Sequence, residues 1–257
     1  MGRGSFVALG SVVAVTGQGT FDWAGVAGVL FDLDGVITPT AEIHEHAWGE
    51  LFAPWEYTTD DYLRYIDGKP RYDGVRSFLA SRGVVLPEGT PDDPAGDDTV
   101  CALGNRKNEL FNEILARDGI APYPSSAATL DLLADLGVPA AIVSSSKNAR
   151  RVLDAAGLGA RFDVVVDGEV AAREHIAGKP APDMFLFAAE RLGVAPERSV
   201  VVEDAASGVA AGAAGGFDVV VGVDRGAGHD TLREHGATIV VDDLAELLPA
   251  AVHRRTS

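Results

Sequence analysis

The chain of 257 residues is long enough for one large domain or for a core with a smaller inserted unit. Its composition, 47% hydrophobic and 23% charged, is typical of globular enzymes. A net charge of −17 argues against nucleic-acid partners and anionic membranes, because phosphate groups bind basic surfaces. No apolar stretch reaches transmembrane length, and Cys101 is the only cysteine, which together favour the reducing cytoplasm.

Residues 1–25 are the first segment in chain order. The apolar residues 11–15, followed by Gly17 and Gly19, resemble a strand that enters a dinucleotide site. The third glycine position of that motif is Asp22, however, and no amphipathic helix follows before the next apolar run. We interpret residues 1–25 as an N-terminal extension, disordered in whole or in part, or as an overlong start of the chain.

The next apolar run, residues 29–31, predicts a short buried strand that ends in Asp32 and Asp34. Side chains two residues apart on an extended chain share a face, so both carboxylates can enter one site. Both carboxylates stay ionised at low free-energy cost only when a cation lies between them. Without a cation, one of them binds a proton. A metal site and acid–base chemistry are therefore both open, and Gly35 allows the sharp exit of the backbone.

Residues 41–119 lack such strands and show helical periodicity instead. The predicted helices cover residues 41–55, 60–66, 72–82 and 100–117, and a loop rich in Pro, Gly and Asp covers residues 87–98. We therefore predict a small helical unit inserted directly after the first core strand.

From Pro122 onwards, short apolar strands alternate with amphipathic helices, which predicts a parallel sheet covered on both faces. The predicted strands are 140–143, 164–166, 200–202, 219–223 and 239–241. The predicted helices are 126–136, 149–156, 182–192, 205–214, 231–234 and 244–248. The predicted fold class is thus α/β, a Rossmann-like parallel sheet formed by residues 26–40 and 120–257 with the helical unit 41–119 inserted.

Polar side chains follow these strands, and active sites of parallel sheets lie at the carboxyl ends of the strands. The polar run 144–148 suits a phosphate or sugar-phosphate cradle, although capping of the next helix accounts for one serine. Lys179 can neutralise a bound anion or lie on the surface. Glu203 and Asp204 fit either a metal site with Asp32 or a solvated turn.

In combination these motifs resemble the haloacid dehalogenase superfamily of phosphotransferases. Within it the chain is most similar to the β-phosphoglucomutase group, which carries a helical cap domain after the first strand. The resemblance covers nearly all of residues 26–249, and its segments are FDLDGVITPTAEIHEHAW, VSSSKN, GKPAPDMF and VVEDAASGV.

The resemblance implies catalytic roles for four acids. Asp32 is the expected nucleophile, which becomes an aspartyl phosphate, and Asp34 is the expected general acid–base. A Mg²⁺ ion is expected on the Asp32 carboxylate, the Asp34 carbonyl and Asp204, with Glu203 assisting.

It also implies a set of substrate-binding residues. Ser144 and Lys179 are expected to hold the transferring phosphoryl group, and Arg71 of the cap the distal phosphate. The other expected positions are Thr40, His44, Trp48, Gly68, Ser145, Ser146, Lys147 and Asn148. Trp48 is equally explained by packing within the cap.

The implied reaction interconverts β-glucose 1-phosphate and glucose 6-phosphate through β-glucose 1,6-bisphosphate. Two cap-side positions, Pro39 and Asp67, depart from the group and leave the choice of sugar open. A sugar-phosphate phosphatase with the same aspartates is the alternative, followed by a phospho-accepting regulatory protein. A dinucleotide-dependent oxidoreductase is disfavoured, because the first strand ends in acids. We expect a cytoplasmic monomer acting on a small sugar phosphate.

Overall fold

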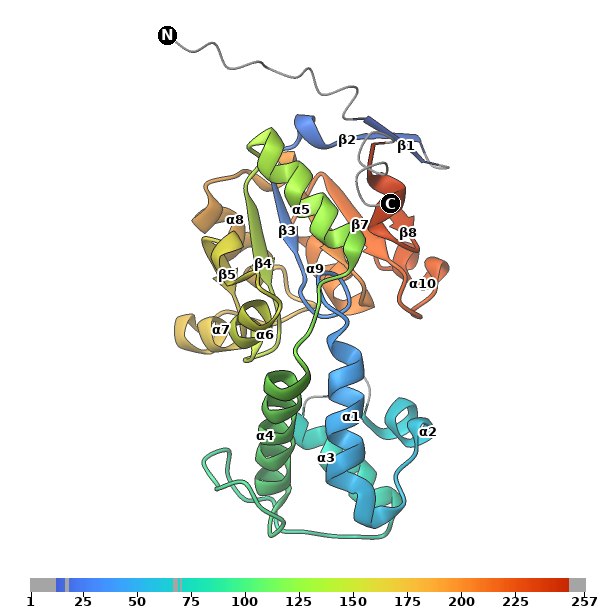
Figure 1. The fold of residues 1–257 in the computed structure, drawn as a ribbon, viewed down its shortest axis with the longest axis vertical. Coiled ribbons are helices and arrows are strands. Elements are labelled where there is room, and N and C mark those ends of the chain that lie inside the picture. Colours follow the sequence, from blue (N-terminus) through green and yellow to red (C-terminus); the bar gives the residue numbers. More distant parts are fainter. Residues whose placement is uncertain (1–12, 17–18, 67–68, 70, 250–257) are drawn as a thin grey trace. The chain divides into compact units, whose positions relative to one another are not determined.

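The computed structural model describes residues 13–16, 19–66, 69 and 71–249 (Figure 1). Its contacts divide the chain into two compact units. One contains Met1–Pro39 and Ala121–Ser257, and the other contains Thr40–Ile120. We call them the core unit and the insert unit.

Within the described residues, the core unit contains a six-stranded sheet in the order β5-β4-β3-β6-β7-β8. The strands are β3 Gly28–Phe31, β4 Ala140–Val143, β5 Val164–Val166, β6 Ser199–Glu203, β7 Val219–Val223 and β8 Ile239–Val241. Every pairing is parallel. β3 is buried throughout and lies between β4 and β6, as its unbroken apolar sequence requires. The predicted α/β fold with a parallel sheet is confirmed.

Helices cover both faces of this sheet. The helices of the core unit are α5 Pro124–Leu136, α6 Ala149–Ala155, α7 Gly168–Glu174, α8 Asp183–Leu192, α9 Ala206–Ala214 and α10 His229–Glu234. α8 packs on β3, β4 and β5, and α9 packs on β6 and β7. Figure 1 shows α5 crossing in front of the sheet with α9 behind it. The parallel arrangement gathers the carboxyl ends of the strands at one edge.

Two short segments differ from the prediction. α7 is a helix of seven residues where no helix was predicted, because one such short helix gives no periodic signal. Its cap is Asp167, whose Oδ1 accepts the N–H groups of Glu169 and Val170 at 3.1 and 2.8 Å. The predicted helix at 244–248 is instead the 3₁₀ helix η6, Leu244–Leu247.

Within residues 1–25, interpreted as an N-terminal extension, the described part is folded. β1, Val13–Thr16, pairs antiparallel with β2, Gly19–Asp22, and the 3₁₀ turn η1, Trp23–Gly25, follows. Trp23 is fully buried, and its Nε1 donates to Leu247 O at 2.8 Å. An antiparallel hairpin is not the strand–helix unit of a dinucleotide site. Residues 1–12 and 17–18 lie outside the described residues.

The insert unit is helical. Its helices are α1 Thr40–Phe52, α2 Thr59–Asp61, α3 Arg71–Ser81 and α4 Val100–Asp118, with the 3₁₀ turn η2 Ala53–Trp55 and the π-helical turn η3 Tyr62–Ile66. The single helix predicted at 60–66 is thus two turns of different type. Phe52 and Phe78 stack at 4.0 Å in a separate apolar core.

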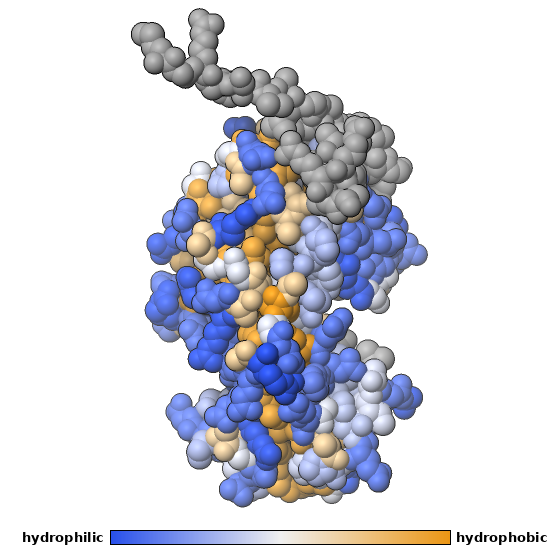
Figure 2. Space-filling view, in the orientation of Figure 1, coloured by the Kyte–Doolittle hydropathy of each residue, from blue (hydrophilic) through white to orange (hydrophobic). Residues whose placement is uncertain are grey.

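The polarity of the surface and the hydropathy of the helices bear on the expectations from the composition. On the face shown in Figure 2, hydrophilic residues lie along the margins of the core unit. No helix among the described residues combines the length and apolar character needed to span a bilayer.

Candidate active site

The turn after β3 carries Asp32 and Asp34. The Asp32 N–H donates to Val202 O at 2.9 Å, which continues the pairing with β6. The Ile37 N–H donates to Leu33 O at 3.0 Å and closes the turn. The turn therefore projects both acids beyond the carboxyl end of the sheet's central strand.

Gly35 is held between two functional groups. Its φ is +84°, and a Cβ on it would lie 2.0 Å from Asp204 Oδ2. Its carbonyl oxygen accepts a hydrogen bond from Arg225 Nε at 2.9 Å. Only glycine satisfies both the backbone angle and the close approach, so this residue brings the turn against Asp204.

Lys179 lies at the centre of the cluster. Its Nζ donates to Asp32 Oδ1 at 2.5 Å, to Glu203 Oε1 at 2.7 Å and to Val143 O at 2.9 Å. The Lys179 side chain is only 5% exposed, so these three acceptors replace water around the ammonium group. The ends of β3, β4 and β6 are thereby tied to one positive charge.

Glu203 orients this lysine. Its Oε1 accepts from Lys179, and its Oε2 accepts the N–H groups of Asp204 and Ala205 at 2.9 and 2.8 Å. A Cβ on Gly208 would lie 1.6 Å from Glu203 Oε1, so α9 approaches the carboxylate closely. Both Glu203 oxygens are engaged within the protein, which fits a positioning role better than the expected help in metal binding.

Negative charge exceeds positive charge in this cluster. Burial raises the pKa of Asp32 well above its usual value; the Lys179 ammonium opposes the shift, and Glu203 and Asp34 add to it. Burial and the charges of Glu203 and Asp34 raise the pKa of Asp204 to about 8. Burial disfavours the charged form of Lys179, yet the carboxylates of Asp32 and Glu203 keep its pKa above the usual value.

Ser144 connects the strand end of β4 to Asp34. Its buried hydroxyl donates to Asp34 Oδ2 at 3.1 Å and accepts the Ser146 N–H at 3.0 Å. Ser146 Oγ in turn accepts the Asn148 N–H at 3.1 Å. Both serines therefore shape the loop as well as offering hydroxyl groups. The structure thus gathers six predicted residues in one cluster: Asp32, Asp34, Ser144, Lys179, Glu203 and Asp204.

The rest of this loop is backed by α7. The Gly168 N–H donates to Ser146 O at 3.0 Å, and a Cβ on Gly168 would lie 2.7 Å from Ser145 O. Ser145 and Lys147 are exposed. The helix that the sequence pattern missed therefore supports the backbone beneath two of the expected substrate-binding side chains.

Two expected residues lie on α1 of the insert unit. Thr40 is buried at its start. His44 accepts a hydrogen bond at Nδ1 from Lys107 Nζ at 2.5 Å and stacks on Phe111 at 4.4 Å. Burial, followed by the charges of Lys107 and Arg71, lowers the pKa of His44 well below its usual value. Both effects favour the neutral form of the His44 imidazole.

Arg71 begins α3. Its guanidinium lies 5.1 Å from the ring centre of Tyr72, whose hydroxyl donates to Asn105 Oδ1 at 2.9 Å. The buried Arg71 Nε has no hydrogen-bond partner, so part of its donor capacity is unused. Trp48 is 4% exposed and stacks on Phe52, which fits the packing interpretation. Gly68 lies outside the described residues.

Sequence reasoning missed two residues. Lys107 occupies the apolar face of α4, four residues from both Leu103 and Phe111, and a lysine at that spacing is a signal that could have found it. Arg225, which holds Gly35 and stacks on Tyr123 at 4.0 Å, gives no such signal because it follows β7 in an ordinary loop.

The family follows from a comparison with known proteins. A family model of haloacid dehalogenase-like hydrolases matches residues 26–216. The chain belongs to this family. The predicted resemblance to the haloacid dehalogenase superfamily, and within it to the β-phosphoglucomutase group, is confirmed, and the chain is an enzyme of that superfamily.

Individual haloacid dehalogenase-like relatives differ in activity. A β-phosphoglucomutase of Mycobacterium tuberculosis (strain CDC 1551 / Oshkosh) is 49% identical over 241 residues, 87% of this chain and 92% of that protein. Hexitol phosphatase A of Escherichia coli (strain K12) is 32% identical over 222 residues, 86% of this chain and 92% of that protein. The crystal structure of CbbY from Rhodobacter sphaeroides in complex with phosphate has a TM-score of 0.68 at 25% identity, covering 88% of this chain and 98% of that chain.

Proposed function

We propose that this protein is a Mg²⁺-dependent phosphomutase that interconverts β-glucose 1-phosphate and glucose 6-phosphate. The observation that carries the proposal is the pairing of two differently held acids. Asp32 is bound by the Lys179 ammonium, whereas Asp34 is bound by the Ser144 hydroxyl. One acid is thus placed as a nucleophile beside a cation, and the other is placed to exchange a proton.

In the first half-reaction, a carboxylate oxygen of Asp32 attacks the phosphorus of a bound sugar bisphosphate. An Asp32–phosphorus bond forms while the bond from phosphorus to the sugar oxygen breaks. Lys179, which contacts Asp32 at 2.5 Å, neutralises charge on the transferring group, and the Ser144 hydroxyl binds one of its oxygens. The carboxylate nucleophile divides one transfer into two steps.

Asp34 moves the proton. Its carboxylic acid form gives a proton to the leaving sugar oxygen, and the resulting carboxylate takes one from the sugar hydroxyl that attacks the aspartyl phosphate in the second half-reaction. The Ser144 hydroxyl donates to Asp34 Oδ2 in the structure, and because it has a single proton it exchanges this acceptor for the phosphoryl oxygen when the substrate binds. The attack forms a sugar bisphosphate again, and this bisphosphate must turn round before it gives its other phosphoryl group to Asp32 in the next first half-reaction.

The residues fit a hard divalent cation. Asp32, Asp34 and Asp204 supply carboxylates in one cluster, and the raised pKa values of Asp32 and Asp204 reflect negative charge that Lys179 alone does not balance. We propose that Asp32, the Asp34 backbone carbonyl and Asp204 hold Mg²⁺. When bound, the ion neutralises and orients the phosphoryl group.

Substrate choice is assigned to the insert unit. Arg71, with its unpaired buried Nε, is proposed to bind the distal phosphate, and Thr40 and His44 to support the acid–base step. The 49% identity to a mycobacterial β-phosphoglucomutase supports the mutase. The 32% identity to hexitol phosphatase A supports the alternative, a sugar-phosphate phosphatase that uses the same two aspartates.

An assay that follows two products in the same sample, called the split assay below, tests this proposal. The purified protein receives β-glucose 1-phosphate, Mg²⁺ and a trace of β-glucose 1,6-bisphosphate. Glucose 6-phosphate is followed by a coupled dehydrogenase, and free phosphate by a dye. We expect glucose 6-phosphate with little free phosphate. Asp32→Asn should abolish the activity, and Asp34→Asn should lower it by about 10²–10⁴-fold.

The matched control is Asp163→Asn, since Asp163 is an exposed aspartate of the same unit and its replacement should leave the rate unchanged. Free phosphate without glucose 6-phosphate would replace the mutase by the phosphatase. A long-lived phosphoprotein that releases no product would instead indicate a phospho-accepting regulatory protein.

A further inference from the structure

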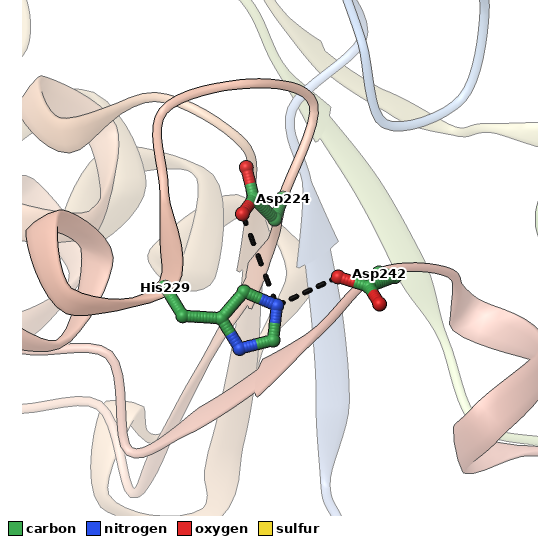
Figure 3. A group of neighbouring side chains, drawn as sticks. All are labelled: Asp224, His229 and Asp242. Carbon is green, nitrogen blue, oxygen red and sulfur yellow. Dashed lines mark hydrogen bonds and ion pairs between the residues drawn. The ribbon is translucent and has the colours of Figure 1, made fainter.

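A second cluster of polar side chains lies at the same edge of the sheet, outside the proposed catalytic residues. It consists of Asp224, His229 and Asp242 (Figure 3). Asp224 directly follows β7, Asp242 directly follows β8, and His229 is the first residue of α10. Three separate segments therefore deliver one side chain each to the same point.

The three side chains present their ligand atoms to one another. His229 Nε2 lies 2.6 Å from Asp242 Oδ1 and 3.8 Å from Asp224 Oδ2. All three ligand atoms lie within 4.8 Å of one another. Figure 3 shows the imidazole edge directed between the two carboxyl groups. The three side chains therefore interact with one another and are not independent surface groups.

Asp224 is fixed by the backbone. Its Oδ1 accepts the N–H groups of Gly226 and Gly228 at 2.8 and 3.0 Å, so the loop after β7 wraps around this carboxylate. Its Oδ2 remains turned toward His229. One ligand is thus rigid, whereas Asp242, whose side chain is 79% exposed, can adjust to a bound ion.

We propose that Asp224, His229 and Asp242 bind a divalent cation of the Zn²⁺ class, independently of the proposed Mg²⁺ site. One imidazole nitrogen with two carboxylate oxygens is a donor set that such borderline cations accept, whereas Mg²⁺ prefers oxygen alone. Ligands of a tetrahedral Zn²⁺ lie about 3.3–3.6 Å apart, and the separations of 2.6 and 3.8 Å fall on either side of that range. The exposed position of Asp242 leaves room for water as the fourth ligand.

The site would brace the end of the sheet. A bound cation joins the segments after β7 and β8 to the start of α10. Arg225, the neighbour of Asp224, donates to both Gly35 O and Asp242 O. The cation therefore fixes the loop that supports the turn after β3, and its effect is structural. The cation binds whether or not the proposed phosphomutase activity is correct.

The competing explanation is an ion pair between protonated His229 and the two aspartates, which uses the same atoms. Nitrogen NMR of the histidine side chains distinguishes a bound cation from an ion pair. Zn²⁺ bound to Nε2 gives this nitrogen a chemical shift that differs from those of an imidazolium and of a hydrogen-bonded neutral imidazole. The spectrum is recorded on the whole protein with excess Mg²⁺, which occupies oxygen-only sites, before and after Zn²⁺ is added. We expect the chemical shift of His229 Nε2 to change with added Zn²⁺ until the change reaches a plateau.

Calorimetry with Zn²⁺ under the same conditions gives the affinity. Asp242→Asn, an isosteric change at an exposed residue, and His229→Ala should each weaken binding at least about tenfold. His235→Ala is the matched control, because His235 is the exposed histidine at the other end of α10 and should leave the affinity unchanged. An unmoved His229 resonance, or equal Zn²⁺ affinity in Asp242→Asn and the unaltered protein, would overturn the proposal.

Discussion

At the scale of single residues, the active-site cluster is defined by one ammonium group among several carboxylates. Lys179 is hydrogen-bonded to Asp32 and Glu203, and burial leaves the pKa of Asp204 raised to about 8. The protein alone therefore leaves charge unbalanced at the place where a phosphoryl group and a cation are proposed to bind. That imbalance has a measurable consequence for stability.

The metal-free protein should lose stability as the pH rises toward 8. An unfolded aspartate has a pKa near 3.8, whereas folded Asp204 has a pKa of about 8, so between these values the folded state binds more protons. The free energy of unfolding should fall with rising pH by at most about 1.4 kcal/mol per pH unit for this group. Urea unfolding from pH 5 to 9 in a chelator measures it.

Asp204→Asn should flatten that slope, since the amide does not titrate. Added Mg²⁺ should raise the unfolding midpoint more at pH 8 than at pH 5, because protons and the cation compete for the same carboxylates. Parallel pH curves for Asp204→Asn and the unaltered protein would show that Asp204 is not the group responsible.

At the scale of elements, the active-site turn depends on a loop from the other half of the sheet. Arg225, after β7, donates to the carbonyl oxygen of Gly35, and its guanidinium lies 4.0 Å from the Tyr123 ring centre. β7 is separated from β3 by β6 in the sheet, so the support reaches across a strand. Arg225 acts as a positioning residue for the turn that carries Asp32 and Asp34.

Arg225→Met should lower kcat by about tenfold to 100-fold with little change in KM, because loosening the turn misplaces the reacting groups without removing a substrate contact. Steady-state kinetics of the split assay measures both constants. Arg233→Met is the control, since its side chain is on α10 and half-exposed. An unchanged kcat in Arg225→Met would mean that the turn holds its shape without the arginine.

The sequence predicted those elements whose patterns are local. Buried parallel strands are continuous apolar runs, so β4, β5, β7 and β8 agree with the prediction to the residue. The N-terminal hairpin was missed because its support is distant, Trp23 being bound to Leu247. The roles of the site residues rested on a resemblance, whereas Arg225 was missed because no local pattern links it to Gly35.

At the scale of the whole molecule, two units carry separate parts of the proposed reaction. The core unit holds Asp32, Asp34 and Lys179, whereas the insert unit holds Arg71, the proposed ligand of the distal phosphate, with apolar packing of its own. The chemistry and the selection of substrate should therefore be separable by mutation.

Arg71→Ala should raise KM for β-glucose 1,6-bisphosphate at least about tenfold, because a charge-assisted hydrogen bond contributes about 1.5–3 kcal/mol. Cleavage of a small aryl phosphate, which has no distal phosphate, should be unchanged. Arg117→Ala, an exposed arginine of α4, is the control. An equal loss of activity on both substrates would mean that Arg71 stabilises the fold and does not select the substrate.

The strand order also bears on how the chain is made. β3 lies between β4 and β6, which come about 110 and about 170 positions later in the chain, and Trp23 donates its hydrogen bond to the still later Leu247. During synthesis from the amino end, the ribosome therefore releases the strand that bears the nucleophile long before its neighbours exist. The insert unit, which forms a compact unit within Thr40–Ile120, emerges next. A nascent chain arrested before residue 199 cannot complete the sheet around Asp32, so we expect it to depend on chaperones.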